Sequence, residues 1–401
     1  MVSSTHKQFT LMNRTHPVCE VEYDTDTHTF SRILKLYEEG MRAPLGMLGM
    51  PIDKVHDHLN SWWKNRSIPK SRPYLEEALQ TIGITSAIEL AYLSHGLSLS
   101  DQYWIKEIDE DVLWEKINFF TNPFSDTVGR LIMHPTIKNI DLENLSNDPS
   151  TTSDGVLPKR WVVIDGIRML MKGSLNSFQE PYNETIATML HSSLLEESHY
   201  VTYTLSKDED TVVSLCPNML KDDEELISAS SVQRIERTER IGTHTSPLEH
   251  YLGCCKSMGI PDARTRISEM IACDYIIANH DRHFGNFGII RNVNTLKCRI
   301  APIYDSGSCL WNQVRDLNIW DKSYVSKPFE EVPEQQLALV KEWDWYDPSR
   351  LDPFAFTEYI KETLSQGPFR FNLIRVDLIS DFVFENIARI EKIREKTVVN
   401  D

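Results

Sequence analysis

The most informative segment of the chain is NHDRHFGNFG, residues 279–288. It follows an apolar pattern of helical spacing and precedes a short apolar run, so we expect a loop between a helix and a strand. Asp281 and Asn286 lie five residues apart on this loop. Phosphoryl transfer needs a carboxylate that accepts the proton of the acceptor hydroxyl and an oxygen ligand for Mg²⁺, and the protein-kinase catalytic loop separates its Asp and Asn equally. The alternative is a polar turn with a helix-ending Asn.

A second acidic group follows in the segment YDSG, residues 304–307. Residues 287–291 and 297–304 have the pattern of a β-hairpin, which would return Asp305 to the side of Asn286. A carboxylate there can bind the Mg²⁺ that bridges the nucleotide phosphates. Gly307 lies two residues beyond Asp305, as in the kinase DFG segment. Taken alone, this segment is also typical of an ordinary turn at the end of a strand.

A lysine and a glutamate upstream complete the predicted charge set. The apolar runs 161–165 and 167–172 flank the dipeptide Asp165-Gly166, a strong signal for a two-residue hairpin. Lys172 ends the second strand and would face a cleft, within reach of nucleotide phosphates. Glu184 lies on the helix predicted for residues 181–195 and can hold that ammonium in an ion pair. The alternative is a surface lysine at the end of an edge strand.

Two segments are candidates for the rest of a nucleotide site. The run NLSNDPSTTSD, residues 144–154, has the composition of a loop. Ser153 and Gly155 lie just before the first strand, where a phosphate-covering loop belongs, although no G-x-G-x-x-G or Walker motif is present. Cys216 and Asn218 lie in the segment CPNM, which would form the hinge that offers backbone groups to adenine. A plain linker is an equal alternative for the hinge.

Two other polar residues near the loop have open roles. His283 lies two residues after Asp281, where it can orient the loop or contact phosphate, and a structural histidine is equally consistent with the pattern. Asp274 interrupts the apolar pattern of the preceding helix. We expect Asp274 to satisfy backbone or arginine groups under the loop rather than to react.

The order of these elements predicts an α+β, two-lobed protein-kinase-like fold. Residues 1–130 have a mostly helical pattern, for example at 30–37 and 75–93. Residues 131–221 form the predicted small lobe, with further strands at 199–205 and 211–216, and residues 222–401 form a helical lobe. Its last helix carries an apolar stripe that belongs to the core, with members Ile379, Phe382, Val383, Ile387, Ile390 and Ile393.

The composition excludes several classes of protein. The 401 residues include 59 Asp and Glu against 42 Lys and Arg, which argues against direct nucleic-acid binding and against docking on an anionic membrane. The seven cysteines are odd in number and scattered, which is typical of reduced core thiols. Neither a signal peptide nor an apolar run of transmembrane length is recognisable. We therefore expect a cytoplasmic protein.

The quoted motifs resemble a known family. NHDRHFGNFGII followed by IAPIYDSG is similar to the C-terminal signature of HipA-like serine/threonine kinases, many of which are toxins of toxin–antitoxin pairs. The resemblance covers roughly residue 153 to the C-terminus and includes Lys172 and the Asn183-Glu184 pair. The first 130 residues do not resemble the usual N-terminal subdomain of HipA toxins. The pattern DRHxxN is also similar to phosphoinositide kinases.

The resemblance implies a role for each motif residue. Asp281 would be the catalytic base, Asn286 and Asp305 would bind Mg²⁺, and Lys172 would bind the phosphates of ATP. Autophosphorylation in the phosphate loop would have three candidate acceptors: Thr151, Thr152 and Ser153. From the resemblance we also expect an antitoxin or another regulatory partner.

The predicted activity is transfer of the γ-phosphoryl group of ATP to Ser or Thr hydroxyls of a protein substrate. Three alternatives stay open at the level of sequence. They are a phosphoinositide or other small-molecule kinase, a nucleotidyl transferase on the same fold, and a non-catalytic nucleotide-binding module.

Overall fold

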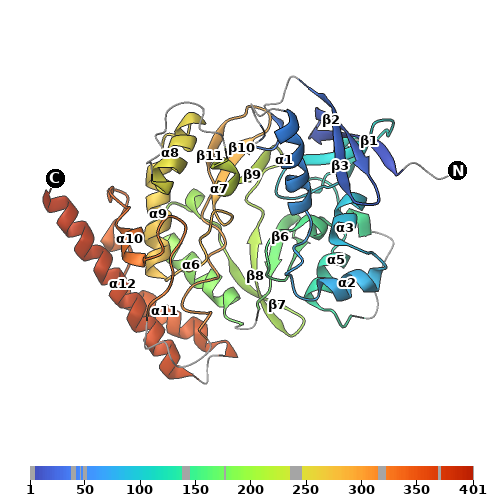
Figure 1. The fold of residues 1–401 in the computed structure, drawn as a ribbon. Coiled ribbons are helices and arrows are strands. Elements are labelled where there is room, and N and C mark those ends of the chain that lie inside the picture. The colour runs from blue at the N-terminus through green and yellow to red at the C-terminus, as the bar shows by residue number, and fades with distance from the viewer. Residues whose placement is uncertain are drawn as a thin grey trace.

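The structure is a computed structural model that describes residues 5–37, 42–45, 47, 52–137, 145–175, 178–234, 246–314, 322–368 and 372–400. Residue 144, the first of the predicted polar loop, lies outside the described residues. In Figure 1 the N-terminal elements, in blue, lie on one side of a central sheet, and the C-terminal helices, in red, lie on the other. No described helix has both the length and the apolar character needed to cross a membrane.

The N-terminal region contains a sheet that the sequence analysis did not predict. Strands β1 (His6–Asn13), β2 (His16–Asp24), β3 (Thr29–Leu36) and β4 (Tyr103–Glu107) form an antiparallel sheet in the order β3-β2-β1-β4. The helix predicted for residues 30–37 is therefore wrong. Pairing with β2 determines the conformation instead, because Phe30 lies opposite Tyr23 and both rings are buried.

Helices accompany this sheet in the rest of the N-terminal region. They are α1 (Ile52–Asn65), α2 (Leu75–Ile82), α3 (Ala87–Leu93), α4 (Trp114–Ile117) and α5 (Thr127–Met133). The helical pattern at 75–93 is thus confirmed as two helices, which are separated where Gly83 adopts φ +72°. A mixture of strands and helices replaces the mostly helical region that we predicted.

The central sheet is the predicted small lobe. Strands β5 (Lys159–Ile164), β6 (Ile167–Lys172), β7 (Thr204–Asp208) and β8 (Thr211–Pro217) form an antiparallel sheet in the order β5-β6-β8-β7. Helix α6 (Glu180–Leu194) connects β6 to the second pair of strands. Asp165 and Gly166 both have positive φ, at 51° and 79°, as a two-residue hairpin turn requires. The predicted hairpin and helix are confirmed.

The strand predicted for residues 199–205 is wrong over most of its length. A short 3₁₀ turn occupies Glu197–His199, and β7 begins only at Thr204. The residues between them pair with a different segment, since Val201 N–H donates to the carbonyl of Ile303 and Ile303 N–H donates to that of His199. The segment before β7 is thus hydrogen-bonded to the C-terminal lobe instead of extending the strand.

The C-terminal lobe is helical with one small sheet. Its helices are α7 (Ala229–Val232), α8 (Pro247–Ser257), α9 (Ala263–Ile276), α10 (Pro333–Leu337), α11 (Pro353–Ser365) and α12 (Leu373–Asn400). Strands β9 (Glu224–Ser228), β10 (Gly288–Asn292) and β11 (Cys298–Ile300) pair in the order β11-β10-β9. The hairpin β10–β11 was predicted, whereas β9 was not. The apolar stripe of α12 is core, with four residues fully buried: Ile379, Val383, Ile387 and Ile390.

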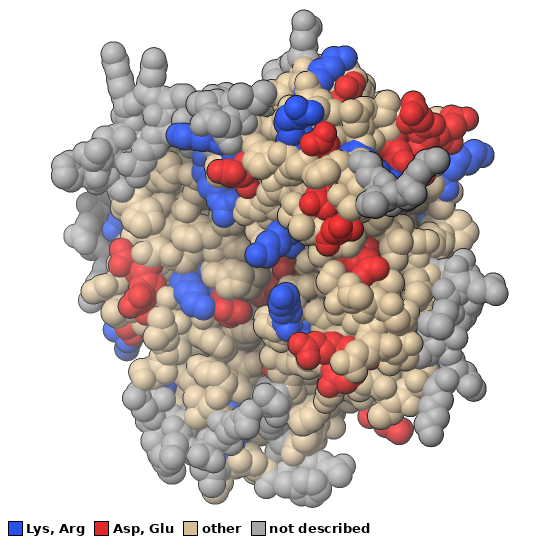
Figure 2. All heavy atoms as spheres, turned by 45° about the vertical axis from the view of Figure 1, so that its right-hand side comes forward, with Lys and Arg blue, Asp and Glu red and all other residues tan. Residues whose placement is uncertain are grey.

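The N-terminal region is attached to both other parts of the chain. Leu226 N–H on β9 donates to the carbonyl of Ser100, and the side-chain amide of Gln102 donates to the carbonyl of Glu224. Arg168 on β6 donates to the carbonyl of Phe119. On the side shown in Figure 2, basic and acidic side chains are intermixed. The division of the chain at residues 130 and 221 stays a prediction, because these contacts cross both boundaries.

Candidate active site

An ion-paired lysine lies between the small sheet and the C-terminal lobe. Lys172, at the end of β6, donates to a carboxylate oxygen of Glu184 on α6. Its Nζ also lies 2.6 Å from Oδ1 of Asp305. The predicted pair of Lys172 and Glu184 is therefore present, and a third predicted residue joins it from a segment more than 130 residues away in the chain. One buried ammonium thus links three segments that the sequence analysis had assigned to one site.

The charges of this trio stabilise one another in a buried setting. Burial alone would lower the pKa of Lys172, but the carboxylates of Asp305 and Glu184 raise it far above its usual value. Burial favours a higher pKa for Asp305, yet the ammonium of Lys172, with Lys159 and Arg282 nearby, holds that pKa well below its usual value. For Glu184, burial raises the pKa and Lys172 opposes the shift. Asp305 is therefore a carboxylate at neutral pH, as a metal ligand must be.

A buried arginine holds the loop that carries Asp281 and Asn286 in place. The guanidinium of Arg282 is fully buried, and it donates to both carboxylate oxygens of Asp274, at 2.7 and 3.0 Å. The side-chain amide of Asn279 donates to the same carboxylate at 2.8 Å. Asp274 thus satisfies arginine and amide groups under the loop, which confirms its predicted role. Asn286 donates its side-chain amide to the carbonyl of Asp281 at 2.9 Å, and this closes the loop between the two predicted functional residues.

The same arginine connects the two predicted metal ligands. One terminal nitrogen of Arg282 donates to the carbonyl of Asn286 at 2.6 Å and to the carbonyl of Tyr304. Tyr304 immediately precedes Asp305, so the backbones that carry Asn286 and Asp305 are held side by side. Asp305 itself adopts φ +58°. A left-handed backbone at a non-glycine residue is uncommon and is concentrated at functional sites.

Helix α6 holds the segment after Asp305 against the site. Ser306 N–H donates to Oε2 of Glu184 at 3.0 Å, and the amide of Asn183 donates to the carbonyl of Gly307 at 2.8 Å. A Cβ atom at Gly307 would lie 3.2 Å from the carbonyl oxygen of Glu180 and from Cγ of Glu184, so the absence of a side chain permits this close approach. Among the described residues, no cluster of three or more His, Cys, Asp or Glu could hold a metal by itself. A site with Asn286 and Asp305 suits Mg²⁺, which takes few protein ligands alongside water and phosphate oxygens.

A second lysine, which the sequence analysis missed, points toward the predicted phosphate loop. Lys159 on β5 pairs directly with Lys172 on β6. A Cβ atom added to Gly155 would lie 2.7 Å from Nζ of Lys159, so this ammonium lies directly against the loop. Burial lowers the pKa of Lys159 to about 8, with Asp305 opposing the shift and Arg72 and Lys172 adding to it. Counting outward from the two-residue turn would have placed Lys159 opposite Lys172 from sequence alone.

The predicted phosphate loop is held by the N-terminal region. Arg72 is buried, and its guanidinium donates to the hydroxyl of Ser153 at 2.7 Å and to the carbonyls of Ser153, Asp154 and Gly155 at 2.6 to 3.0 Å. These acceptors are neutral carbonyl groups rather than carboxylates. Burial lowers the pKa of Arg72 to about 10. No local motif pointed to Arg72, because its partners lie about eighty residues further along the chain.

The three candidate acceptors for autophosphorylation are buried hydroxyls in this structure. Ser153 donates to the carbonyl of Ser150 at 2.8 Å, Thr151 donates to that of Asp148 at 2.8 Å, and Thr152 donates to that of Leu97 at 2.7 Å. Each side chain is less than a tenth exposed. None of them can therefore receive a phosphoryl group without movement of the loop.

The predicted hinge is only partly available to a nucleotide. Cys216 is buried in β8, where burial raises the pKa of its thiol to about 12, and it pairs with Leu170. The backbone N–H of Asn218 donates to the carbonyl of Arg168 at 2.8 Å, and its side-chain amide donates to that of Leu99 at 3.1 Å. The Asn218 N–H is thus already used within the protein, contrary to the expectation that it is offered to adenine.

His283 lies in the loop, and the contacts that it makes are hydrogen bonds within the turn. Its side chain is exposed, and its Nδ1 accepts a hydrogen bond from Gly285 N–H at 3.0 Å. Its backbone N–H donates to the carbonyl of Asp281. A catalytic role for His283 stays a prediction.

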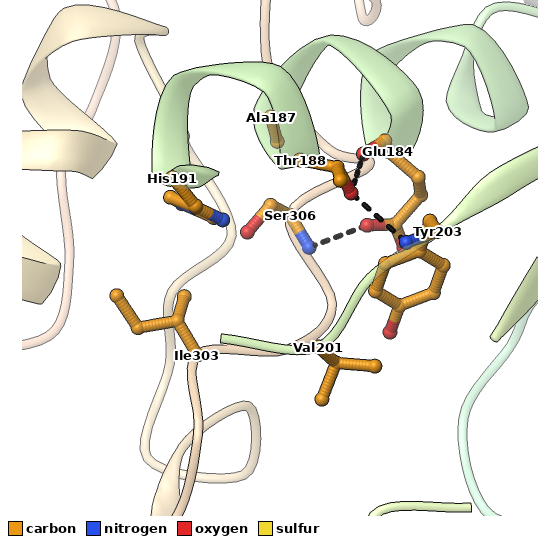
Figure 3. Close-up of a pocket in the computed structure, with 8 residues that line it drawn as sticks. All are labelled: Glu184, Ala187, Thr188, His191, Val201, Tyr203, Ile303 and Ser306. Atoms are coloured by element: carbon orange, nitrogen blue, oxygen red, sulfur yellow. Dashed lines mark hydrogen bonds between the residues drawn. The ribbon is translucent and has the colours of Figure 1, made fainter. Parts of the chain in front are cut away.

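A small pocket lies next to Glu184 of the ion pair. It lies among α6, the segment before β7 and the segment around Asp305, and its walls include Glu184, His191, Tyr203 and Ser306. Figure 3 shows Glu184 receiving the hydrogen bond from Ser306 at one edge of this pocket. Burial lowers the pKa of His191 to about 3, so its ring is neutral. We interpret the pocket as a packing gap that supports the ion pair.

The arrangement confirms the predicted two-lobed, kinase-like α+β fold. A small antiparallel sheet supplies a strand lysine, and the helix that follows supplies its glutamate. The largely helical lobe then supplies the loop with Asp281 and Asn286 and the segment with Asp305.

Comparison with known proteins gives limited matches. No protein-family model matches the chain. A stretch of 49 residues is 45% identical to the serine/threonine-protein kinase CtkA of Helicobacter pylori, which corresponds to 12% of this chain and 15% of that protein. The crystal structure of the H. pylori proinflammatory kinase CtkA superposes with a TM-score of 0.46 and 16% identity, over 60% of this chain and 94% of that one. The matched sequence thus spans a small part of the relative, and the fold assignment rests on the elements described above.

Proposed function

We propose that the protein is an ATP- and Mg²⁺-dependent kinase that transfers the γ-phosphoryl group to a Ser or Thr hydroxyl of a protein substrate. The observation that carries the proposal is the position of the Lys172 ammonium between Glu184 and Asp305. A buried lysine with two carboxylates is costly to form, and this one joins the phosphate-binding side of the site to the metal-binding side. The local identity to a protein named as a serine/threonine kinase supports the same activity.

Each residue has a defined part in this proposal. Lys172 and Lys159 bind the phosphates of ATP, and Glu184 orients Lys172. Asp281 orients the acceptor hydroxyl and takes its proton. Asn286 and Asp305 would hold Mg²⁺, which supplies charge neutralisation on the phosphates when it is bound. The protein contributes positioning and fixed charges, which are the main sources of catalysis in phosphoryl transfer.

The test compares two carboxylate variants with a surface control. Asp281→Ala should nearly abolish phosphoryl transfer from radiolabelled ATP and leave calorimetric ATP binding intact. Asp305→Ala should weaken Mg·ATP binding as well. Asp57→Ala is the control, because that carboxylate is 87% exposed on α1. Undiminished transfer by either site variant would overturn the assignment.

The mass of the product separates the remaining chemistries. Incubation with Mg·ATP followed by intact-mass spectrometry reports whether a phosphoryl or an adenylyl group is added. Transfer to dephosphorylated casein without transfer to phosphoinositide vesicles would support a protein kinase. Addition of an adenylyl group, or transfer to lipid alone, would contradict this proposal.

A further inference from the structure

A lysine that no motif pointed to lies beside Asp281 of the candidate site. Nζ of Lys327 lies 2.9 Å from Oδ1 of Asp281. The two side chains are 40% and 38% exposed, so both can be reached from solvent. An ion pair as exposed as this one contributes only about 0–1 kcal/mol to stability. Stability alone therefore gives little reason for a lysine to be directed at this carboxylate.

The backbone around Lys327 is fixed by hydrogen bonds on both sides. The side-chain amide of Gln336, on α10, donates to the carbonyl of Lys327 at 2.9 Å and accepts from Glu330 N–H at 2.9 Å. Ser326 donates its hydroxyl to the carbonyl of Glu330 at 2.7 Å and its N–H to the carbonyl of Glu331 at 2.9 Å. Residues 326–331 thus form a closed turn, and the position of Lys327 is determined by the fold.

An aromatic anchor attaches this turn to the catalytic loop itself. Phe329 is buried, and its ring lies 5.6 Å from that of Phe284 and 6.2 Å from that of Phe287. Both partners lie within the segment 279–288 that carries Asp281. Close packing of these rings fixes the two loops relative to each other. The ammonium of Lys327 therefore has a defined position beside the carboxylate of Asp281.

We propose that Lys327 is a further catalytic residue, which holds the transferred phosphoryl group on the acceptor side; this proposal rests on the proposed kinase function. The acceptor oxygen forms a bond to the γ-phosphorus, while the bond from that phosphorus to the bridging oxygen breaks and its electron pair leaves with ADP. The hydroxyl proton passes to Asp281, and Lys327 keeps its own protons. Negative charge is spread over three equatorial oxygens during transfer, and a cation beside the base lies near them.

The two lysines serve opposite ends of the reaction in this proposal. Lys172 forms ion pairs with Glu184 and Asp305, at the side of the site where Mg²⁺ would bind. Lys327 instead lies beside Asp281, at the acceptor side. Binding of ATP should therefore depend on Lys172, and turnover should depend on Lys327.

The experiment measures turnover and ATP binding separately. With purified full-length protein, Mg·ATP and dephosphorylated casein, Lys327→Met should lower kcat about 10²–10³-fold, which is the usual effect of removing one charge-stabilising donor. The calorimetric affinity for Mg·ATP should stay unchanged, and Lys327→Arg should lose less activity because it keeps the charge. Lys322→Met is the control, since Lys322 is 44% exposed in the same part of the chain and pairs with Glu385 on α12 instead.

The outcomes distinguish this inference from the proposed function. Failure of the unmodified protein to transfer a phosphoryl group would overturn the kinase proposal and this one together. If Asp281→Ala abolishes transfer and Lys327→Met does not lower kcat, only the role of Lys327 is wrong. A higher kcat in Lys327→Met would show that the lysine lowers the activity of the base Asp281. If Lys327→Arg loses as much activity as Lys327→Met, and the thermal unfolding midpoint falls in both variants, the role of the lysine is structural. Each of these results contradicts the proposal.

Discussion

Lys159 and Lys172 lie directly opposite each other on the antiparallel strands β5 and β6, yet their surroundings differ. Two carboxylates hold Lys172 in its charged form. Burial lowers the pKa of Lys159 to about 8, with Asp305 opposing the shift and the cations of Arg72 and Lys172 adding to it. An anion bound between the predicted phosphate loop and the sheet would favour the charged form of this lysine. The pair therefore provides one lysine whose charge is already balanced by carboxylates of the protein and one whose charge a bound phosphate would balance.

This difference predicts a pH dependence of ATP binding. Bound phosphates favour the charged form of Lys159, so they should raise its pKa above the value of about 8 in the free protein. Affinity should be highest below pH 8 and fall by up to about tenfold per pH unit above it, because binding then requires uptake of one proton. Isothermal titration calorimetry between pH 7 and 9.5 measures this slope.

Lys159→Met is the matched variant for that measurement. It should bind ATP more weakly at pH 7 and show no such slope between pH 8 and 9.5. Its free energy of unfolding at pH 7 should rise, because the lowered pKa means that the charged lysine costs stability below about pH 8 in the folded state. In the unmodified protein this cost should diminish as pH rises from about 8 toward 10.5. A retained slope in Lys159→Met would assign the pH dependence to another group.

Two glycines with similar backbone angles permit a second test of the phosphate loop. Gly155 and Gly166 have φ of +85° and +79°, so alanine should strain either position by about 1–2 kcal/mol. A Cβ atom at Gly155 would also meet Nζ of Lys159 at 2.7 Å, whereas nothing lies within 4 Å of one at Gly166. Gly155→Ala should therefore weaken ATP binding, and Gly166→Ala should not. Equal ATP affinity in the two variants would show that Lys159 does not act through this loop.

Local motifs were enough to predict the central hairpin and most of the charge set. The turn at Asp165-Gly166 specifies its own backbone angles, and it thereby fixes the strand that ends in Lys172. Asp274 was recognised because a carboxylate in an apolar helix needs nearby donors. In both cases the necessary information lies within a few residues of the feature.

Other features depend on partners that lie far away in the chain. Strand β9 begins with Glu224 and Glu225, a pattern that argues against a buried strand. Both carboxylates are buried because Arg299 and Arg291 pair with them. The sheet of the N-terminal region was missed for a related reason, since its strands are determined by pairing rather than by local preference.

The contact of Arg72 with the phosphate loop predicts that the N-terminal region supports nucleotide binding. Arg72→Met should remove up to five hydrogen bonds to Ser153, Asp154 and Gly155. Amide hydrogen exchange at residues 153–155 should become faster, and the KM for ATP should rise while kcat at saturating ATP changes little. Arg130→Met is the control, because Arg130 is exposed on α5. Unchanged exchange in the loop would show that other contacts are sufficient to hold it.

The final prediction concerns the buried ion pair. Lys172→Met would leave the carboxylates of Glu184 and Asp305 without their shared ammonium, and breaking a buried pair in this way typically costs about 3–5 kcal/mol. Urea unfolding should show this loss in the single variant. The double variant Lys172→Met with Glu184→Leu also removes one of the two carboxylates and should recover part of the stability without recovering ATP binding. If the double variant is no more stable than Lys172→Met, the loss comes from packing around α6 rather than from the uncompensated charge.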